Sequence, residues 1–113
     1  MVKHVWEELD REAVALIRDE GAVVAIPVGA IEQHGSHMPV GTDSLLSRRV
    51  ATGAAELASH NVLLLPAMPY GFSPHHLSHA GTISFRLSTY LAVLRDMAES
   101  LVETGFRLSL IHI

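Results

Sequence analysis

The sequence predicts an α/β fold in which helices pack against a mostly parallel β-sheet. Helical patterns alternate along the chain with short apolar runs, in the order helix, strand, loop, helix, strand, loop, helix, strand. The apolar runs are almost continuous, which is typical of strands buried on both faces. Strands that alternate with helices favour a parallel sheet. A length of 113 residues allows one small domain.

The first helix is predicted over residues 6–20 and the first strand over residues 22–28. Val14 and Ile17 recur at helical spacing, and charged side chains occupy the other side of the helix. Gly21 is well placed to end the helix. The strand has the sequence AVVAIPV, which is apolar and rich in β-branched residues.

The segment after this strand is predicted to be a loop that leads into a second helix. Residues 29–42 contain three glycines and one proline, which favours a loop. Thr42 or Asp43 is expected to cap the second helix, which continues to about residue 59.

The second half of the chain repeats this order. A strand is predicted over residues 61–65 and a loop rich in Pro, Gly, Ser and His over residues 66–81. Ser88 is expected to cap a third helix, Gly105 to end it, and residues 106–113 to begin another strand. The apolar side chains of this helix expected to face the core are Leu91, Leu94, Ala98, Leu101 and Val102.

The two long loops each follow a predicted strand directly. Ligands of parallel α/β sheets bind beyond the carboxyl ends of the strands. We therefore expect residues 29–42 and 66–81 to meet at one edge of the sheet and to form the functional site there.

The chain ends within an apolar strand pattern, so we expect residues 1–113 to be the N-terminal part of a single longer domain, truncated at its C-terminus. Residues 107–113 allow two interpretations. They fit a strand, and they also look like the start of an extraneous tail that recurs in fragmentary gene models.

Composition narrows the class of protein. The formal net charge is −4 and no basic run is present, which argues against a nucleic-acid surface. Cysteine is absent, so a disulfide framework, a CxxC zinc site and a cysteine nucleophile are excluded. The first residues lack the apolar run of a signal peptide, and the longest apolar run is too short to span a bilayer. We expect a cytoplasmic protein with no membrane partner.

Glu32, His34 and Asp43 are the candidate metal ligands. If the chain is extended at residues 31–34, Glu32 and His34 project to the same side. The glycines and proline that follow let the chain fold back, so that Asp43 can meet them. Carboxylate with imidazole suits Zn, Mn or Fe(II), and such a site favours hydrolysis by metal-activated water.

A purely structural interpretation stays open for the same three residues. Asp43 would then be only a helix cap, Glu32 a solvated loop residue and His34 a hydrogen-bond donor in the loop. The spacing E-x-H is a weak signal when it is taken alone.

Two longer motifs resemble the creatininase family of metal hydrolases. Residues 27–43, PVGAIEQHGSHMPVGTD, look like the first signature of the family nearly in full. Residues 69–84, PYGFSPHHLSHAGTIS, resemble its G-x-S-x-x-H loop with the turn P-G-T-I-S. In this chain Ala80 occupies the position where the family frequently has a proline, and His79 the position where it frequently has an aromatic residue. The resemblance covers about positions 5 to 107.

The resemblance implies a three-layer α/β/α sandwich, a homohexamer and two divalent metal ions (Zn, Mn or Fe). By this resemblance Glu32 binds the first ion, His34 binds the second and Asp43 bridges the two. A His in an N-G-H motif, a further acidic ligand and a catalytic His-Glu region are expected beyond residue 113. The implied activity is hydrolysis of small-molecule substrates at non-peptide or cyclic amide C–N bonds, as in creatinine amidohydrolase.

Other polar residues of the two loops are expected to act around the metal ligands or at the surface. His76, and after it Ser73, is expected to contact the substrate, although a loop hydrogen bond is an equal alternative for His76. His37 is expected to support the metal ligands rather than to bind metal. His75 and His79 are expected at the surface or at an interface. Ser36 lies in H-G-S-H rather than G-x-S-x-G, so a serine nucleophile is not predicted.

Two classes of function remain for the chain. One is part of a metal-dependent amidohydrolase; the other is an inactive fragment or a metal-binding module without catalysis of its own. With three candidate ligands, we expect residues 1–113 alone to bind metal weakly and to hydrolyse nothing. A sugar- or nucleotide-binding module has little support, because no phosphate-cradling glycine motif precedes a helix.

Overall fold

The centre of the molecule is a three-stranded parallel sheet. A computed structural model describes residues 4–112. The strands are β1 (Val23–Val28), β2 (Val62–Leu64) and β3 (Arg107–His112), and β1 lies between the other two. Val23 pairs with Val62 on one side and with Arg107 on the other. The predicted parallel sheet is confirmed, with each strand slightly shorter than expected.

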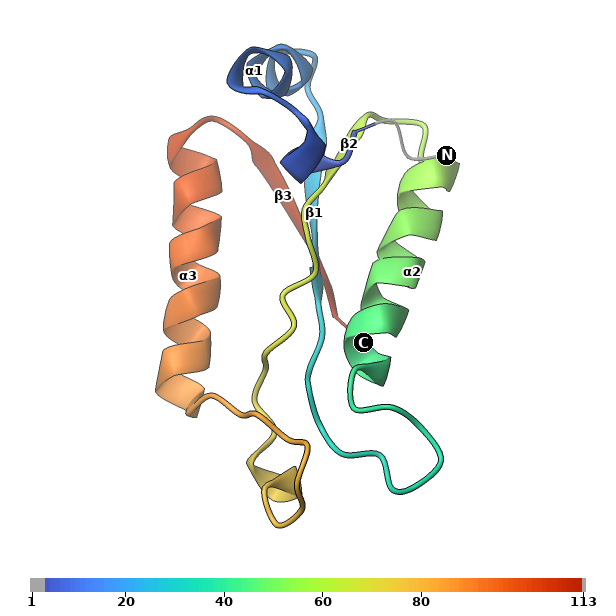
Figure 1. The fold of residues 1–113 in the computed structure, drawn as a ribbon. Coiled ribbons are helices and arrows are strands. Elements are labelled where there is room, and N and C mark those ends of the chain that lie inside the picture. Colours follow the sequence, from blue (N-terminus) through green and yellow to red (C-terminus); the bar gives the residue numbers. More distant parts are fainter. Residues whose placement is uncertain (1–3, 113) are drawn as a thin grey trace.

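Helices cover both faces of this sheet. α2 (Thr42–Leu57) lies on one side and α3 (Leu87–Glu103) on the other, which gives three layers (Figure 1). A short 3₁₀ helix, η1 (Trp6–Glu8), and α1 (Arg11–Asp19) lie at the end of the sheet where β1 begins. The two long loops lie at the opposite end, and one of them contains η2 (Pro74–His76).

Strand β1 is buried on both faces because a helix covers each of them. Val24, Ile26 and Val28 are at most 1% exposed and pack in the larger core cluster with side chains of α3. Ala25 points to the other face and packs with Ala51 of α2. A continuous apolar run is thus required at β1, as the sequence pattern indicated.

Helix α2 packs on the sheet through small side chains. Ser47 and Ala51 are 0% exposed. Gly29, which follows β1, allows the close approach: a Cβ built on it would lie 2.4 Å from the Cα of Ser44. The larger apolar side chains of this helix are exposed: Leu45, Leu46, Val50 and Leu57.

The helix predicted over residues 6–20 is two elements. η1 ends at Glu8 and α1 begins at Arg11. Asp10 causes the break, because its extended backbone and its side chain, which accepts a hydrogen bond from the Ala13 amide at 2.8 Å, cap α1. Gly21 ends the helix with a φ of 85°, as predicted.

Two predicted helix caps are wrong. Gly41 is the N-cap of α2, so Thr42 and Asp43 both lie inside its first turn. Arg86 is the N-cap of α3, and Ser88 lies inside the helix. Neither cap residue makes a side-chain capping hydrogen bond. Tertiary contacts of the preceding loops set these boundaries in place of a local polar cap.

The predicted core face of α3 is partly wrong. Leu101 is buried and Leu94 packs against the core, and Ala98 is half-buried. Leu91 and Val102, however, are 54% and 64% exposed. Both lie on α3 beside the narrow row of side chains that packs against this small sheet. Gly105 ends the helix as predicted, with a φ of 91°.

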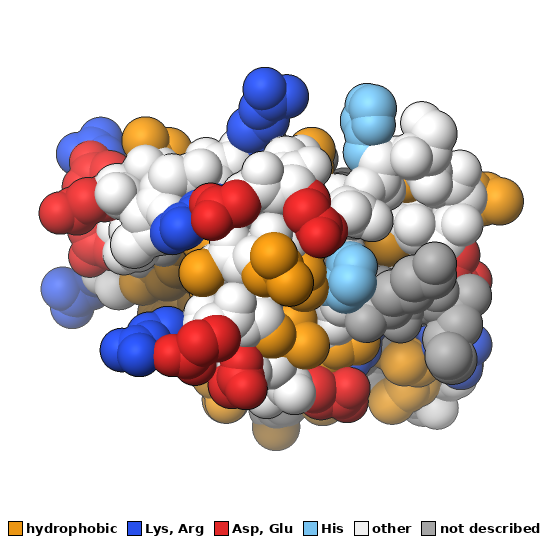
Figure 2. All heavy atoms as spheres, turned by 90° about the horizontal axis from the view of Figure 1, so that it is seen from above, with side chains coloured by type: hydrophobic (Ala, Val, Ile, Leu, Met, Phe, Trp, Pro, Cys, Tyr) orange, Lys and Arg blue, Asp and Glu red, His pale blue; other side chains and the backbone are white. Residues whose placement is uncertain are grey.

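The end of the molecule away from the long loops has a mixed surface. Figure 2 shows acidic and basic side chains close together on this face, with small apolar areas between them. Among the described residues, no helix is both long enough and apolar enough to cross a membrane.

The contact between Gly29 and α2 gives a first prediction. Gly29→Ala should destabilise the fold by about 1–3 kcal/mol, because the new methyl group would overlap the Ser44 backbone. Gly53→Ala is the matched control. A Cβ there meets nothing within 4 Å, so this helix-interior change should stabilise the fold by about 0.5–1 kcal/mol. Urea unfolding followed by circular dichroism measures both. Equal stability of Gly29→Ala and the wild type would contradict the close packing of α2.

Candidate metal centre

The two long loops meet beyond the carboxyl ends of β1 and β2, as predicted. The Gly29 amide donates to the Met68 carbonyl at 2.9 Å, which extends the pairing of these strands into the loops. Farther out, the Ile83 amide donates to the Ile31 carbonyl at 3.0 Å. The segment after β1 therefore lies beside the segment after β2 at one edge of the sheet.

Glu32, His34 and Asp43 come together at this edge. The His34 Nε2 atom lies 3.1 Å from Asp43 Oδ2 and 3.9 Å from Glu32 Oε1. The ligand atoms of all three side chains lie within 4.8 Å of one another. Each side chain is 15–19% exposed, so the cluster is half-buried but open to solvent.

The loop reaches this geometry by folding back on itself. The Glu32 amide donates to the Val40 carbonyl at 3.1 Å, which brings the two ends of the loop together. The Thr42 hydroxyl donates to the Pro39 carbonyl at 2.6 Å where α2 begins. Asp43 is therefore held in the first turn of α2 beside Glu32. Because Gly41 is the N-cap, the interpretation of Asp43 as only a helix cap is wrong.

The two carboxyl groups have opposite pKa shifts. Burial raises the pKa of Asp43, and its hydrogen bond to Glu32 raises it further against the opposing effect of His34. Burial also acts to raise the pKa of Glu32, but hydrogen bonds with Asp43 and Ser73 and the nearby His76 and His34 outweigh it, so that pKa is lowered. The surroundings of the pair therefore favour the ionised form of Glu32 and disfavour the ionised form of Asp43.

Ser73 supports Glu32 from inside the molecule. It is 1% exposed, and its side chain hydrogen-bonds Glu32. Its amide donates to the Ser84 hydroxyl at 2.8 Å, which ties it to the end of the second loop. Ser73 also lines the cavity onto which Glu32 opens. Contact of Ser73 with a substrate stays a prediction.

The remaining histidines of the loops divide into two groups. His76 is half-buried, and its Nε2 atom lies 3.9 Å from Glu32 Oε2. The exposed His75 has a ring nitrogen within 4.8 Å of ligand atoms of Glu32 and His76. Sequence reasoning missed this proximity, although the H-H pair after Pro74 was a usable signal. His37 and His79 are exposed and join neither cluster.

A cavity of about 370 Å³ opens on the two carboxylates. This volume lies in the range of small-molecule sites. Burial raises the pKa of Tyr90, whose phenol therefore stays protonated at neutral pH and can donate a hydrogen bond into the cavity. The residues that line the cavity are Gly29, Ala30, Glu32, Asp43, Phe72, Ser73, His75 and Tyr90.

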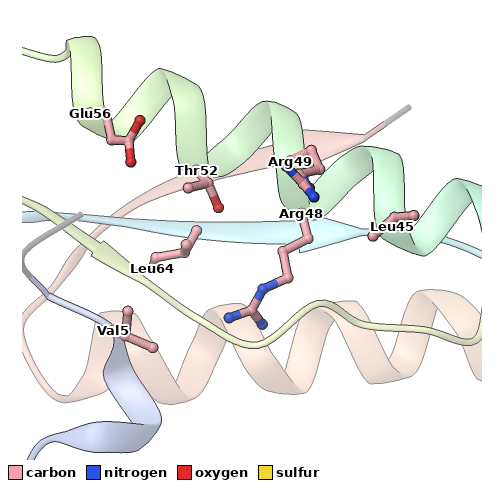
Figure 3. Close-up of a pocket in the computed structure, with 7 residues that line it drawn as sticks. All are labelled: Val5, Leu45, Arg48, Arg49, Thr52, Glu56 and Leu64. Atoms are coloured by element: carbon pink, nitrogen blue, oxygen red, sulfur yellow. The ribbon is translucent and has the colours of Figure 1, made fainter. Parts of the chain in front are cut away.

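A second cavity, of about 440 Å³, lies away from the cluster between α2 and β2 (Figure 3). Val5 and Leu64 form an apolar part of its wall. Arg48 extends away from α2 here, and its Nη1 atom lies 3.9 Å from Glu7 Oε1. The cavity is lined by none of the described residues that could together hold a metal ion, so it is a weaker candidate for chemistry. The other lining residues are Leu45, Arg49, Thr52 and Glu56.

The donor set of the cluster fits a divalent cation. Two carboxylates and one imidazole supply oxygen and nitrogen ligands of the kinds that Zn and Mn accept. The three ligand atoms are close enough together to share an ion. A cation would also offset the burial of the Asp43 carboxylate and its repulsion by Glu32, both of which raise the pKa of Asp43.

Comparison with known proteins identifies a family. The creatininase family model, described as creatinine amidohydrolase, matches residues 7–112. A mycofactocin precursor peptide peptidase from Mycobacterium tuberculosis (strain ATCC 25618 / H37Rv) is 35% identical over 85 residues, covering 68% of this chain and 34% of the relative. A creatinine amidohydrolase from Pseudomonas putida is 31% identical over 107 residues, covering 90% of this chain and 39% of the relative. The chain thus spans 34–39% of the length of these relatives.

Solved creatininase structures share the fold. A mutant creatininase complexed with creatine superposes with a TM-score of 0.86 at 30% identity, covering 96% of this chain and 44% of that one. A mutant creatininase of Zn-Zn type gives a TM-score of 0.84 at 30% identity, covering 94% and 43%. A creatininase with Mn gives 0.85 at 31% identity, covering 96% and 44%.

The pKa shift of Asp43 gives a second prediction. A raised pKa means that the folded state binds this proton more tightly than the unfolded chain does. The corresponding stability is present at low pH and is lost as the pH rises through the raised pKa. Asp43→Asn should therefore stabilise the metal-free chain at pH 7 by about 0.5–2 kcal/mol, with no difference below the ordinary carboxyl pKa.

Glu32→Gln is the contrasting variant, because the pKa of Glu32 is lowered. Its ionised form stabilises the fold above the ordinary carboxyl pKa, so its loss should destabilise the chain at pH 7. Urea unfolding in the presence of a chelator, at pH 3 and at pH 7, measures both variants. A destabilised Asp43→Asn at pH 7 would contradict the repulsion within the cluster.

Proposed function

The chain belongs to the creatininase family, and on that premise we propose that it forms part of a metal-dependent hydrolase of amide C–N bonds. The observation that carries the proposal is the clustering of Glu32, His34 and Asp43, two of which, Glu32 and Asp43, also line one cavity. Family relatives of known activity include a creatinine amidohydrolase and a peptide peptidase, both of which cleave C–N bonds.

We propose that Glu32, His34 and Asp43 hold two divalent ions, with Asp43 shared between them. Solved relatives of Zn-Zn type and with Mn support a divalent metal. Asp43 is the best placed of the three for sharing, because it lies 3.1 Å from His34 and also hydrogen-bonds Glu32. When bound, such ions polarise the substrate carbonyl and lower the pKa of water.

In this proposal the chain's own side chains orient the metal ligands and bind the substrate. Ser73 holds the Glu32 carboxylate from the buried side, which fixes the direction in which it faces the cavity. His34 and Asp43 hold each other at hydrogen-bond distance. The protonated phenol of Tyr90 at the cavity wall offers a donor to a substrate oxygen or nitrogen.

The site and the relatives together support a proposal for the substrate class. A cavity of about 370 Å³ suits a small molecule or a short chain end. One solved relative is complexed with creatine. We propose a non-peptide or cyclic amide as the substrate, and a homo-oligomer as the working assembly. Exposed apolar side chains on α2, such as Leu46 and Val50, supply surface for such an assembly.

Asp43→Ala tests this function in a protein of the relatives' full length that contains this chain. Loss of the shared ligand should remove bound metal and lower kcat/KM by more than about 100-fold. Mutation of a residue that only hydrogen-bonds a metal ligand already lowers metal affinity or activity by about 10–100-fold, and loss of a ligand itself should cost more. Metal content by elemental analysis and hydrolysis of creatinine or an analogous amide measure the two effects. His79→Ala is the matched control, because His79 lies in the second long loop but is exposed and outside both clusters. An Asp43→Ala protein that keeps its metal and its full activity would contradict the proposal that Asp43 is a metal ligand.

The second candidate function is a metal-binding module without hydrolysis of its own, and the 113-residue chain distinguishes the two. With three ligands in the cluster, the isolated chain should bind Zn²⁺ weakly, lose it on a desalting column and hydrolyse no amide. Isothermal titration and elemental analysis give the affinity and stoichiometry. Tight binding of two ions by this chain alone would favour the metal-binding module.

A further inference from the structure

Gln33 is held by two hydrogen bonds that fix which way its amide faces. Its Oε1 atom accepts from the Gly35 amide at 2.9 Å. Its Nε2 atom lies 2.8 Å from Nδ1 of His76, across the gap between the two loops. The oxygen and nitrogen of a side-chain amide are told apart by their partners. Because Gly35 N–H can only donate, the atom facing it is the oxygen, and the NH₂ group faces His76.

This orientation determines the tautomer of His76. An amide NH₂ group donates and does not accept, so the His76 Nδ1 atom facing it must carry a lone pair. In a neutral imidazole the single proton is then on Nε2. The opposite tautomer would place two donors against each other. An amide flip would not relieve this, since it would turn the NH₂ group toward the Gly35 N–H.

The N–H group of His76 defined in this way faces the candidate metal centre. Nε2 lies 3.9 Å from Glu32 Oε2, which is beyond hydrogen-bond distance. Within residues 4–112, no hydrogen bond to His76 Nε2 is formed. The side chain is 27% exposed, so a ligand oxygen has access to this donor. A fixed, neutral donor at the edge of a half-buried site suits a carbonyl oxygen or the oxyanion derived from it.

We propose that Gln33 is a positioning residue that holds His76 as a neutral Nε2–H donor for the oxygen of an amide substrate. The donor role rests on the proposed function, whereas the tautomer does not. It also follows that His76 does not bind metal through Nε2, although Glu32, His75 and His76 lie close enough together to suggest such a site. Ligation there would need the lone pair that the proton occupies.

Nitrogen-15 NMR of the histidine rings in the metal-free chain at neutral pH tests the tautomer directly. The Nε2–H form of His76 should exceed the other by about fivefold, the ratio that one hydrogen bond of ordinary net strength sustains. Gln33→Glu is the sharpest variant. Its carboxylate still accepts from Gly35 but can no longer donate to His76, so the ring should carry a proton on Nδ1.

Two comparisons make the result specific. Gln33→Leu removes both interactions and should leave a mixture of His76 tautomers. His79 is the internal control, because its Nδ1 partner is the hydroxyl of Ser78 at 3.0 Å and should not respond to Gln33. Nδ1–H as the main form of His76 in the wild type, or an unchanged ratio in Gln33→Leu, would overturn the proposal. The wild-type measurement decides the tautomer even if a variant does not fold.

Titration of the labelled chain with Zn²⁺ separates this proposal from the proposed function. Resonances of His34 should shift while the Nε2–H signal of His76 persists. Loss of that signal through coordination would overturn the positioning role. Unmoved His34 resonances would count against the metal centre and leave the tautomer intact. In a full-length protein that contains this chain, His76→Phe, which has no N–H group, should lower kcat by about 10²-fold with little change in KM, the effect of losing one oxyanion donor. An unchanged kcat would refute the donor role.

Discussion

The hydroxyl of Ser44 is the contact on which the geometry of the loop edge depends. It lies 3.0 Å from the Ala30 carbonyl and 3.3 Å from the Pro69 carbonyl, so one side chain of α2 joins the segments that follow β1 and β2. The contact exists only because Gly29 leaves room for the helix backbone. Asp43 precedes Ser44 in the chain, and its place beside Glu32 follows from this anchoring of the first turn of α2.

The cluster that results disfavours the ionised form of Asp43 when no cation is bound. Two half-buried carboxyl groups face one imidazole, and burial with mutual repulsion raises the pKa of Asp43. At this site ionised Asp43 therefore lowers the free energy of unfolding of the metal-free protein, and a bound divalent ion would offset this loss. This is the usual relation between stability and function at a binding centre, in which the groups that attract a ligand repel one another in its absence.

Local patterns predicted the order and type of the main elements. The apolar run of β1, the helical spacing around Ile17 and the stop at Gly21 each follow from local chemistry. Helix starts were less predictable: Asp10 breaks the first helix, and Arg86 precedes α3 without a capping side chain. The exposed Leu91 shows a similar limit, because the width of the buried stripe depends on how much sheet lies beneath the helix.

The sequence by itself determined the α/β class, the two loops at one edge and the grouping of Glu32, His34 and Asp43, since these follow from strand direction, short spacing and a recognisable motif. Only the tertiary structure decided that Ser73 hydrogen-bonds Glu32 and that Gln33 reaches His76. These contacts join residues 41 and 43 positions apart. Each depends on how closely two loops approach, a distance set by Gly29, Ser44 and the strand pairing together. No local pattern encodes such a distance, because it results from packing between segments remote in the chain.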